Sequence, residues 1–212
     1  MKNFRWKENK VFSITLRNDY YVLAQMLKAP YIVIYNIFSD SDEWSDVCLS
    51  EESILFCKAT TKQLFKRGVF HEQKMLSPLA KPKVPSLWIK RGAGAYKAKV
   101  WPGTADELEF VMIGEDTSSL IKRDIYAEDF SLGEVVKALR QPEDDATIDE
   151  CEMNDQVVYP SFIERLYLCG KLGRNVDPEK ELIFNRPLNP EYKTYFKIIS
   201  GKYEVKQFGY CG

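Results

Sequence analysis

Short apolar runs separated by polar breaks dominate the first sixty residues of the chain. Residues 10–16 and 20–27 predict two strands, and residues 17–19 between them carry the Asn and Asp that favour turns. Residues 31–38 are almost all apolar or aromatic, as expected of a central strand that is covered on both faces. Residues 53–57 predict a fourth strand. Short strands at this spacing favour a small antiparallel β-barrel or a strongly twisted sheet of the SH3-like kind.

A helix and a linker follow this group of strands. Residues 60–68 predict a short helix, with a threonine as its N-cap and Gly68 beyond its end. Residues 81–85 contain two prolines, which fix φ and lack a backbone donor, and this composition indicates a linker. We therefore predict two domains, a β domain over residues 1–80 and a second domain over residues 84–212.

Strands resume after the linker. Residues 87–90, 95–101 and 108–113 have the apolar spacing of strands. Residues 91–94 read Arg-Gly-Ala-Gly, and we expect them to form a flexible hairpin turn between the first two of these strands.

The rest of the chain mixes helix and strand signals. Residues 131–140 and 161–171 each open with a Ser-x-x-Glu capping box and predict helices. Residues 177–178 are Asp-Pro, which predicts a further turn of helix. Residues 192–199 and 202–208 predict a terminal β-hairpin around a Ser-Gly turn. The C-terminal part is thus α+β, and so is the chain as a whole.

The composition is that of a folded protein with almost no net charge. Hydrophobic residues make up 45% of the chain, which supplies enough apolar material for an interior. Lys and Arg number 30 and Asp and Glu number 31, so the net charge does not mark the whole chain as an obvious binder of nucleic acid or membrane. We find no apolar run near the ~18 residues of a membrane span, and no signal peptide. A cytoplasmic location is the expectation.

Residue types that carry catalysis are sparse. His71 is the only histidine, so a Ser-His-Asp or Cys-His triad would need it, and no nucleophile motif surrounds it. The five cysteines include no C-x-x-C pair, which predicts reduced thiols rather than a zinc site. Residues 91–94 lack the third glycine or the Gly-Lys-Ser ending of a phosphate loop. We expect no catalytic residue, metal or cofactor; an enzyme with a dispersed site is the alternative.

Charge is unevenly spread along the chain. Between Lys58 and Lys99 there are eleven basic residues and a single acid, Glu72. A nucleic-acid-binding β-barrel protein would use this basic segment, with aromatic side chains that stack on bases. Its residues would be Lys62, Lys66, Arg67, Lys90 and Arg91, beside Trp88, Tyr96 and Trp101. We find no standard RNA-binding motif and regard nucleic acid as the less favoured partner.

Two acidic segments flank the basic one. The first holds Asp40, Asp42, Glu43 and Asp46, and the second holds Glu143, Asp144, Asp145 and Asp149. Either these residues are solvated loops, or they form an acidic face that docks a basic partner. Four tryptophans, Trp6, Trp44, Trp88 and Trp101, are candidates for interface anchors, because Trp is enriched at binding hot spots.

The opening meander also carries a family resemblance. Residues 6–16 end in Val-Phe-Ser-Ile-Thr-Leu, residues 20–27 read Tyr-Tyr-Val-Leu-Ala-Gln-Met-Leu, and residues 32–37 read Ile-Val-Ile-Tyr-Asn-Ile. This order resembles the Imm26-type immunity proteins of bacterial polymorphic toxin and contact-dependent inhibition systems. The resemblance covers about residues 4–75 and departs from the family pattern where Asn9-Lys10 replaces Gly-Asp and Thr15 replaces Pro.

The resemblance implies a binding function. Such a protein would neutralise a cognate toxin domain, for which a nuclease is one candidate, in the cytoplasm and without turnover of its own. Since many such toxins are basic, the two acidic segments become the expected contact surface, with Trp44 as the anchor of the first. The expected partner-binding residues are Asp40, Asp42, Glu43, Trp44, Asp46, Glu143, Asp144, Asp145 and Asp149. The oligomeric state is left open.

Overall fold

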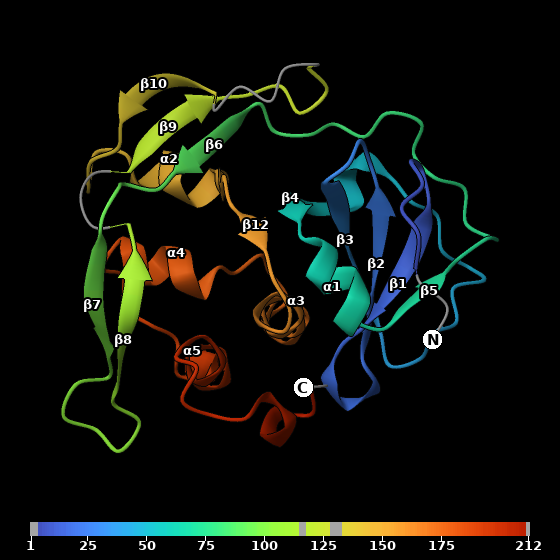
Figure 1. The fold of residues 1–212 in the computed structure, drawn as a ribbon. Coiled ribbons are helices and arrows are strands. Elements are labelled where there is room, and N and C mark those ends of the chain that lie inside the picture. The colour runs from blue at the N-terminus through green and yellow to red at the C-terminus, as the bar shows by residue number, and fades with distance from the viewer. Residues whose placement is uncertain (1–3, 115–117, 128–132, 211–212) are drawn as a thin grey trace. The chain divides into compact units, whose positions relative to one another are not determined.

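The computed structural model describes residues 4–114, 118–127 and 133–210, and it has the mixed α+β content expected (Figure 1). About 25% of the chain is helical and 30% is strand, which confirms the α+β class. The chain divides into two compact units. The first unit comprises Met1–Val84, Gln156–Val176 and Glu204–Gly212, and the second comprises Pro85–Asp155 and Asp177–Tyr203.

A curled six-stranded sheet forms the first unit. Its spatial order is β12 (Gln156–Val157), β4 (Ile54–Thr60), β3 (Tyr31–Ser39), β2 (Tyr21–Met26), β1 (Val11–Thr15) and β5 (Phe70–Glu72). All neighbours are antiparallel except the parallel pair β12 and β4. The predicted meander of four strands is therefore confirmed, and bulges in the β2–β3 and β3–β4 pairs strengthen its twist.

Both faces of this sheet are covered. Phe12, Ala24, Ile34 and Phe56 lie opposite one another on successive strands and so share one face. Helices α1 (Lys62–Arg67) and α3 (Ser161–Leu172) pack on that face. Phe65 of α1 contacts the ring of Phe12, and Phe162 of α3 contacts the ring of Phe56. The five residues Tyr31–Tyr35 of the central strand are all buried, as the apolar run predicts.

The side chain of Gln25 holds the segment around Leu79 against the opposite face of the sheet. Its side-chain oxygen accepts hydrogen bonds from the Tyr35 hydroxyl at 2.8 Å and from the backbone N–H of Leu79 at 3.0 Å. Its amide nitrogen donates to the carbonyl of Leu79 at 2.8 Å. A fully buried amide must find such partners, and here they fix the segment after β5 across the sheet.

Helix α1 follows both predicted end signals, whereas α3 follows only its predicted stop. Helix α1 (Lys62–Arg67) begins after Thr61, whose hydroxyl accepts from the Leu64 N–H, and it ends at Gly68. Helix α3 (Ser161–Leu172) ends at Gly173, which has the left-handed φ of 64° that a glycine C-cap adopts easily. The capping box predicted at Ser161 is wrong, because Pro160 is the N-cap and the Glu164 carboxylate instead bonds Arg17 and Tyr210.

The second unit contains two sheets. One has the order β10 (Glu134–Ala138), β9 (Ser119–Lys122), β6 (Leu87–Lys90) and β11 (Glu152–Met153), and the other pairs β7 (Ala95–Val100) with β8 (Leu108–Ile113). The strands predicted at 87–90, 95–101 and 108–113 are confirmed. The turn predicted at 91–94 is wrong as a hairpin, because β6 pairs with β9 and β11 while β7 pairs only with β8.

The helices of the second unit are α2 (Asp145–Glu150), α4 (Pro178–Ile183) and α5 (Lys193–Ile199). The predicted turn at 177–178 is confirmed, since the Asp177 side chain caps α4 by accepting from the Lys180 N–H at 3.1 Å. The buried ammonium of Lys180 donates to the carbonyls of Ile148, Asp149 and Cys151 at the end of α2.

The helix predicted over residues 131–140 is wrong. Residues 134–138 form β10 instead, with Val135 paired to Ile121 of β9. Gly133 has a φ of 84°, which no right-handed helix contains, and β-branched Val135 and Val136 favour a strand. Ser131, the start of the expected capping box, lies outside the described residues.

The terminal hairpin is also wrong. Residues 193–199 form helix α5, and residues 202–208 hold only a 3₁₀ turn at Val205–Phe208. The buried side chains Tyr192, Tyr195 and Phe196 recur at helical spacing, and Asn189-Pro190 begins the helical segment. The aromatic and β-branched residues of this segment favour a strand, but the helical spacing of its buried apolar residues agrees with the helix that forms.

The two units are not continuous in sequence, unlike the predicted domains at residues 1–80 and 84–212. The chain does pass from the first unit to the second at Val84/Pro85, within the proline-containing linker. It then returns, because residues 156–176 and 204–212 belong to the first unit.

Candidate functional site

The first acidic segment forms a loop after β3 that is organised around Asp42. One carboxylate oxygen of Asp42 accepts from the indole N–H of Trp44 at 2.6 Å and from the amide of Gln73 at 2.9 Å. The other lies 2.6 Å from Nδ1 of His71 in β5. Ser13 of β1 adds a further hydrogen bond to this carboxylate. The loop is thus fastened to two strands of the sheet.

These hydrogen bonds set the charge state of Asp42. Burial on its own would raise the pKa of the carboxyl group, but the hydrogen bonds from Ser13, Trp44 and His71 outweigh burial and lower it. Asp42 is therefore ionised at neutral pH, and Nδ1 of His71 carries the proton that it donates to this carboxylate.

Trp44 does not serve as the exposed anchor that we expected. Its side chain is only 6% exposed, and its N–H is occupied by Asp42. Trp44 instead holds the loop in one conformation. Asp40, Glu43 and Asp46 remain exposed on that loop, so three of the five residues predicted in this segment present free carboxylates to solvent.

His71 and Asp42 resemble two members of a catalytic triad, but the third member is misplaced. Ser13 is fully buried and contacts the carboxylate of Asp42. In a triad the nucleophile lies instead at the opposite ring nitrogen of the histidine. The geometry of this group supports a structural role.

The second acidic segment is largely neutralised within the chain. Asp144 forms an ion pair with Lys137, and its carboxylate also accepts from the Arg140 backbone N–H. Asp145 and Asp149 both pair with Arg186. Glu143 alone is exposed without such a contact among the residues that the structure describes. This segment therefore offers less unbalanced negative charge than the loop around Asp42.

The basic residues considered for nucleic-acid binding fall into two groups. Lys62, Lys66 and Arg67 are exposed on α1 of the first unit, whereas Lys90 and Arg91 belong to the second unit. Arg91 is committed to Asp155 and Glu179, each at 2.6 Å. Of the aromatic side chains named with them, Trp88 is buried and Tyr96 and Trp101 are half-buried.

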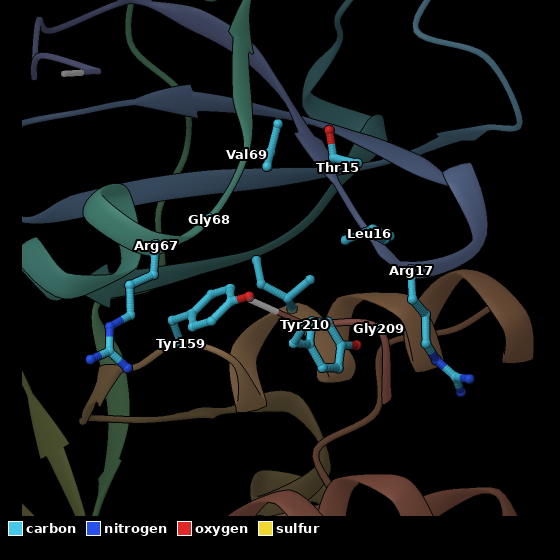
Figure 2. A pocket seen from close by; sticks show the side chains of 10 residues that line it. Thr15, Leu16, Arg17, Arg67, Gly68, Val69, Tyr159, Gly209 and Tyr210 are labelled. Carbon is cyan, nitrogen blue, oxygen red and sulfur yellow. The ribbon is translucent and has the colours of Figure 1, made fainter. Parts of the chain in front are cut away.

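Figure 2 shows a small pocket of the first unit, with Arg67 and Arg17 at opposite ends and Tyr159 and Tyr210 between them. Its volume is about 80 Å³, well below the ~300–1,000 Å³ of pockets for drug-sized ligands. Leu16, Val69 and Ile163 supply much of its lining.

Several polar groups beside this pocket contact one another. Arg17 forms an ion pair with Glu164, in which Nε lies 3.0 Å from Oε2 and Nη2 donates a hydrogen bond to Oε1 at 3.1 Å, and its guanidinium lies over the ring of Tyr167. The Tyr210 hydroxyl donates to the same carboxylate at 2.5 Å. Burial raises the pKa of Glu164, while Tyr210 and Arg17 act in the opposite direction. The group ties the last residues of the chain to α3. Two buried polar atoms of the pocket lining, Oγ1 of Thr15 and Nε of Arg17, have no hydrogen-bond partner among the described residues.

Sequence reasoning missed an aromatic hollow on the first unit. Phe4, Trp6 and Phe65 line it together with Lys62 and Lys66. Phe4 and Phe65 were not considered, although the alternation Phe-Arg-Trp-Lys over residues 4–7 is a visible signal. Trp6 was one of four candidate anchors, and only the structure separates it from the buried Trp44 and Trp88.

Metal sites, membrane helices and disulfides can be assessed over the described residues. Within them, no group of His, Cys, Asp and Glu side chains is arranged to hold a metal ion. No helix there has both the length and the apolar character that crossing a bilayer requires. Among the described residues, Cys48, Cys57, Cys151 and Cys169 are not in disulfides, and Cys211 lies outside the described residues.

Comparison with known proteins gives one match. No curated protein and no solved structure is detectably similar to this chain. A family model does match residues 1–187, which include parts of both units. The chain therefore belongs to the family described as "Domain of unknown function (DUF8309)".

Proposed function

We propose that this chain is a binding protein that neutralises a cognate bacterial toxin domain in the cytoplasm, as an immunity protein does. The observation that carries the proposal is the loop around Asp42. It presents Asp40, Glu43 and Asp46 to solvent while Trp44, His71 and Gln73 hold its backbone in place.

A fastened loop suits this role for two physical reasons. Less conformational entropy is lost on binding when the contact surface is already ordered, so more of the interaction energy appears as affinity. Exposed carboxylates close together in the sequence also attract a basic partner over several ångströms and speed the encounter. A basic nuclease domain is the partner whose charge best complements this loop.

The family resemblance supports the same function from a separate direction. Its residues form β1 to β3, the strands from which the acidic loop departs and to which Asp42 is bonded through Ser13. The resemblance and the loop therefore concern the same part of the molecule.

A growth-protection assay tests the proposal. The toxin domain encoded beside this protein is expressed in a bacterial host, with either the native chain or the triple variant Asp40→Lys, Glu43→Lys, Asp46→Lys. The native chain should restore growth and the triple variant should fail to do so. Asp42 is left unchanged in this design, because its loss would unfasten the loop.

The matched control reverses three other exposed acids, Glu8→Lys, Glu150→Lys and Glu204→Lys, and should protect as well as the native chain. Equal protection by both triple variants would reject the loop as the contact surface. Absence of protection by the native chain, with both proteins present at normal levels, would reject the proposed function.

A further inference from the structure

Three aromatic rings from two separate segments meet at the surface of the first unit. Phe4 and Trp6 come from the segment before β1, and Phe65 comes from α1. The ring of Phe65 lies 6.0 Å from that of Phe4, nearly parallel to it, and 5.5 Å from that of Trp6. All three are half-buried, and with Lys62 and Lys66 they line a hollow of about 230 Å³.

Contacts with other residues of the first unit hold the rings of Trp6 and Phe65 in place. The Trp6 indole N–H donates to the carbonyl of Leu27 at 3.1 Å, which fixes the orientation of the ring. Phe65 packs on Phe70 at 5.0 Å and on the fully buried Phe12 at 6.2 Å. The hollow is thus a preformed aromatic surface, and a ligand would bind to it with little loss of side-chain entropy.

The charge around the hollow is positive. Lys62 and Lys66 are four residues apart on α1 and therefore lie on the same face of the helix. Both are exposed, and no carboxylate among the described residues pairs with either one. None of the described residues that line the hollow is acidic, and exposed Arg5 and Lys7 alternate with Phe4 and Trp6.

We infer that this hollow binds single-stranded nucleic acid, with one base stacked on the aromatic rings and Lys62 and Lys66 on the neighbouring phosphates. The volume is smaller than that of pockets for drug-sized ligands, as suits one planar base. Aromatic rings beside lysines are the combination that binds single strands without sequence preference, because every base has a π-face and every nucleotide a phosphate. This inference goes beyond the proposed function and uses none of the residues of the acidic loop, so either can fail alone.

Fluorescence anisotropy with a labelled 12-nucleotide oligouridine tests the inference, in low salt and at physiological salt. We expect binding that weakens as salt rises, since bound lysines release counterions from the strand. Replacing Phe65→Leu keeps an apolar side chain at this half-buried position but removes the ring. It should weaken binding by roughly 5- to 150-fold, the effect of losing one stacked base.

The contribution of Lys62 and Lys66 can be measured separately, through the salt dependence of binding. The double variant Lys62→Ala, Lys66→Ala should weaken binding and lower the slope of log affinity against log salt by about 1.4, because each phosphate contact on a single strand contributes about 0.7. Both lysines are exposed, so this variant should fold normally. The matched control Lys74→Ala, Lys81→Ala removes the same charge from exposed positions of the same unit outside the hollow, and it should bind like the native chain.

Three results would overturn the inference. The first is no anisotropy change at low salt. The second is equal loss of affinity in the Lys62/Lys66 and Lys74/Lys81 variants, which would indicate non-specific attraction. The third is binding of an acidic, tryptophan-containing peptide that depends on Phe65 while oligouridine does not bind, which would make the hollow a peptide site.

Discussion

Asp42 connects the acidic loop to the sheet, so among the residues of this loop its replacement should destabilise the protein most. Replacing Asp42→Ala removes the acceptor for Trp44, His71 and Gln73. We expect the free energy of unfolding to fall by about 1.5–3 kcal/mol, the usual value of hydrogen bonds to a charged group. Urea unfolding measures it. Asp40→Ala on the same loop should stay within about 0.5 kcal/mol of the native chain. Equal losses in the two variants would contradict the arrangement described here.

The contribution of Asp42 should also depend on pH. Its folded-state pKa is lowered, so the folded protein holds the proton more weakly than the unfolded chain does. The stabilisation is therefore complete above the unfolded pKa of about 3.9 and is lost as pH falls through the lower folded value. The difference in unfolding free energy between the native chain and Asp42→Asn should shrink as the pH falls below about 4. A difference that grows below about pH 4 would reverse the assigned sign.

Residue types in the acidic segments were readable from the sequence, but their roles were not. The charges of Asp40, Glu43 and Asp46 could be predicted to face solvent, since carboxylates are rarely buried. The orientation of Trp6 depends on a distant partner, the Leu27 carbonyl. Trp44 bonds its near neighbour Asp42, but Asp42 is itself held by His71 and Gln73 from about thirty residues later in the chain. No local pattern encodes such distant partners.

At the scale of elements, the packing of α3 on the sheet depends on Gly170. A Cβ at this position would lie 2.5 Å from a ring carbon of Tyr20 and 2.7 Å from one of Phe38. Ala is the better helix former by about 1 kcal/mol, yet we expect Gly170→Ala to lower the free energy of unfolding by about 1–3 kcal/mol, because overpacking outweighs propensity.

A double-mutant cycle separates these two effects. Tyr20→Ala alone should destabilise the protein. Gly170→Ala should then cost less stability in the Tyr20→Ala background than in the native chain, since the clash with the Tyr20 ring is relieved. Strictly additive losses in urea unfolding would show that Gly170 is not a point of close approach between α3 and the sheet.

The elements that the sequence predicts best are those with a strong local signal. Helix α1 has its Thr61 cap, and β3 begins with five consecutive apolar or aromatic residues. Strand β10 and helix α5 were missed because two local signals conflict. A capping box competes with Gly133 and paired valines in one case, and aromatic composition competes with helical spacing in the other. Very short strands such as β11 and β12 have no period to detect; their partners lie some 60 to 100 residues earlier in the chain.

At the scale of the whole molecule, the chain leaves the first unit at Val84 and returns to it twice. Tyr210 fastens the last return through Glu164 of α3. We expect Tyr210→Phe to lower the free energy of unfolding by about 1.5–3 kcal/mol, because a buried, charge-assisted hydrogen bond is lost. Thermal or urea unfolding measures the loss. An unchanged stability would mean that residues after 204 contribute little to the first unit.

The central claim is that this chain acts by binding a basic protein partner through its fastened acidic loop. The association rate constant of the purified chain with its cognate toxin domain, measured by stopped-flow at low and physiological salt, tests it most directly. We predict fast association that slows as salt rises, and at least a tenfold slower rate at low salt for the Asp40, Glu43 and Asp46 charge-reversal variant, because electrostatic steering supplies about 10- to 1,000-fold. The Glu8, Glu150 and Glu204 control should associate like the native chain. An association rate that is independent of both salt and the loop charges would contradict the claim.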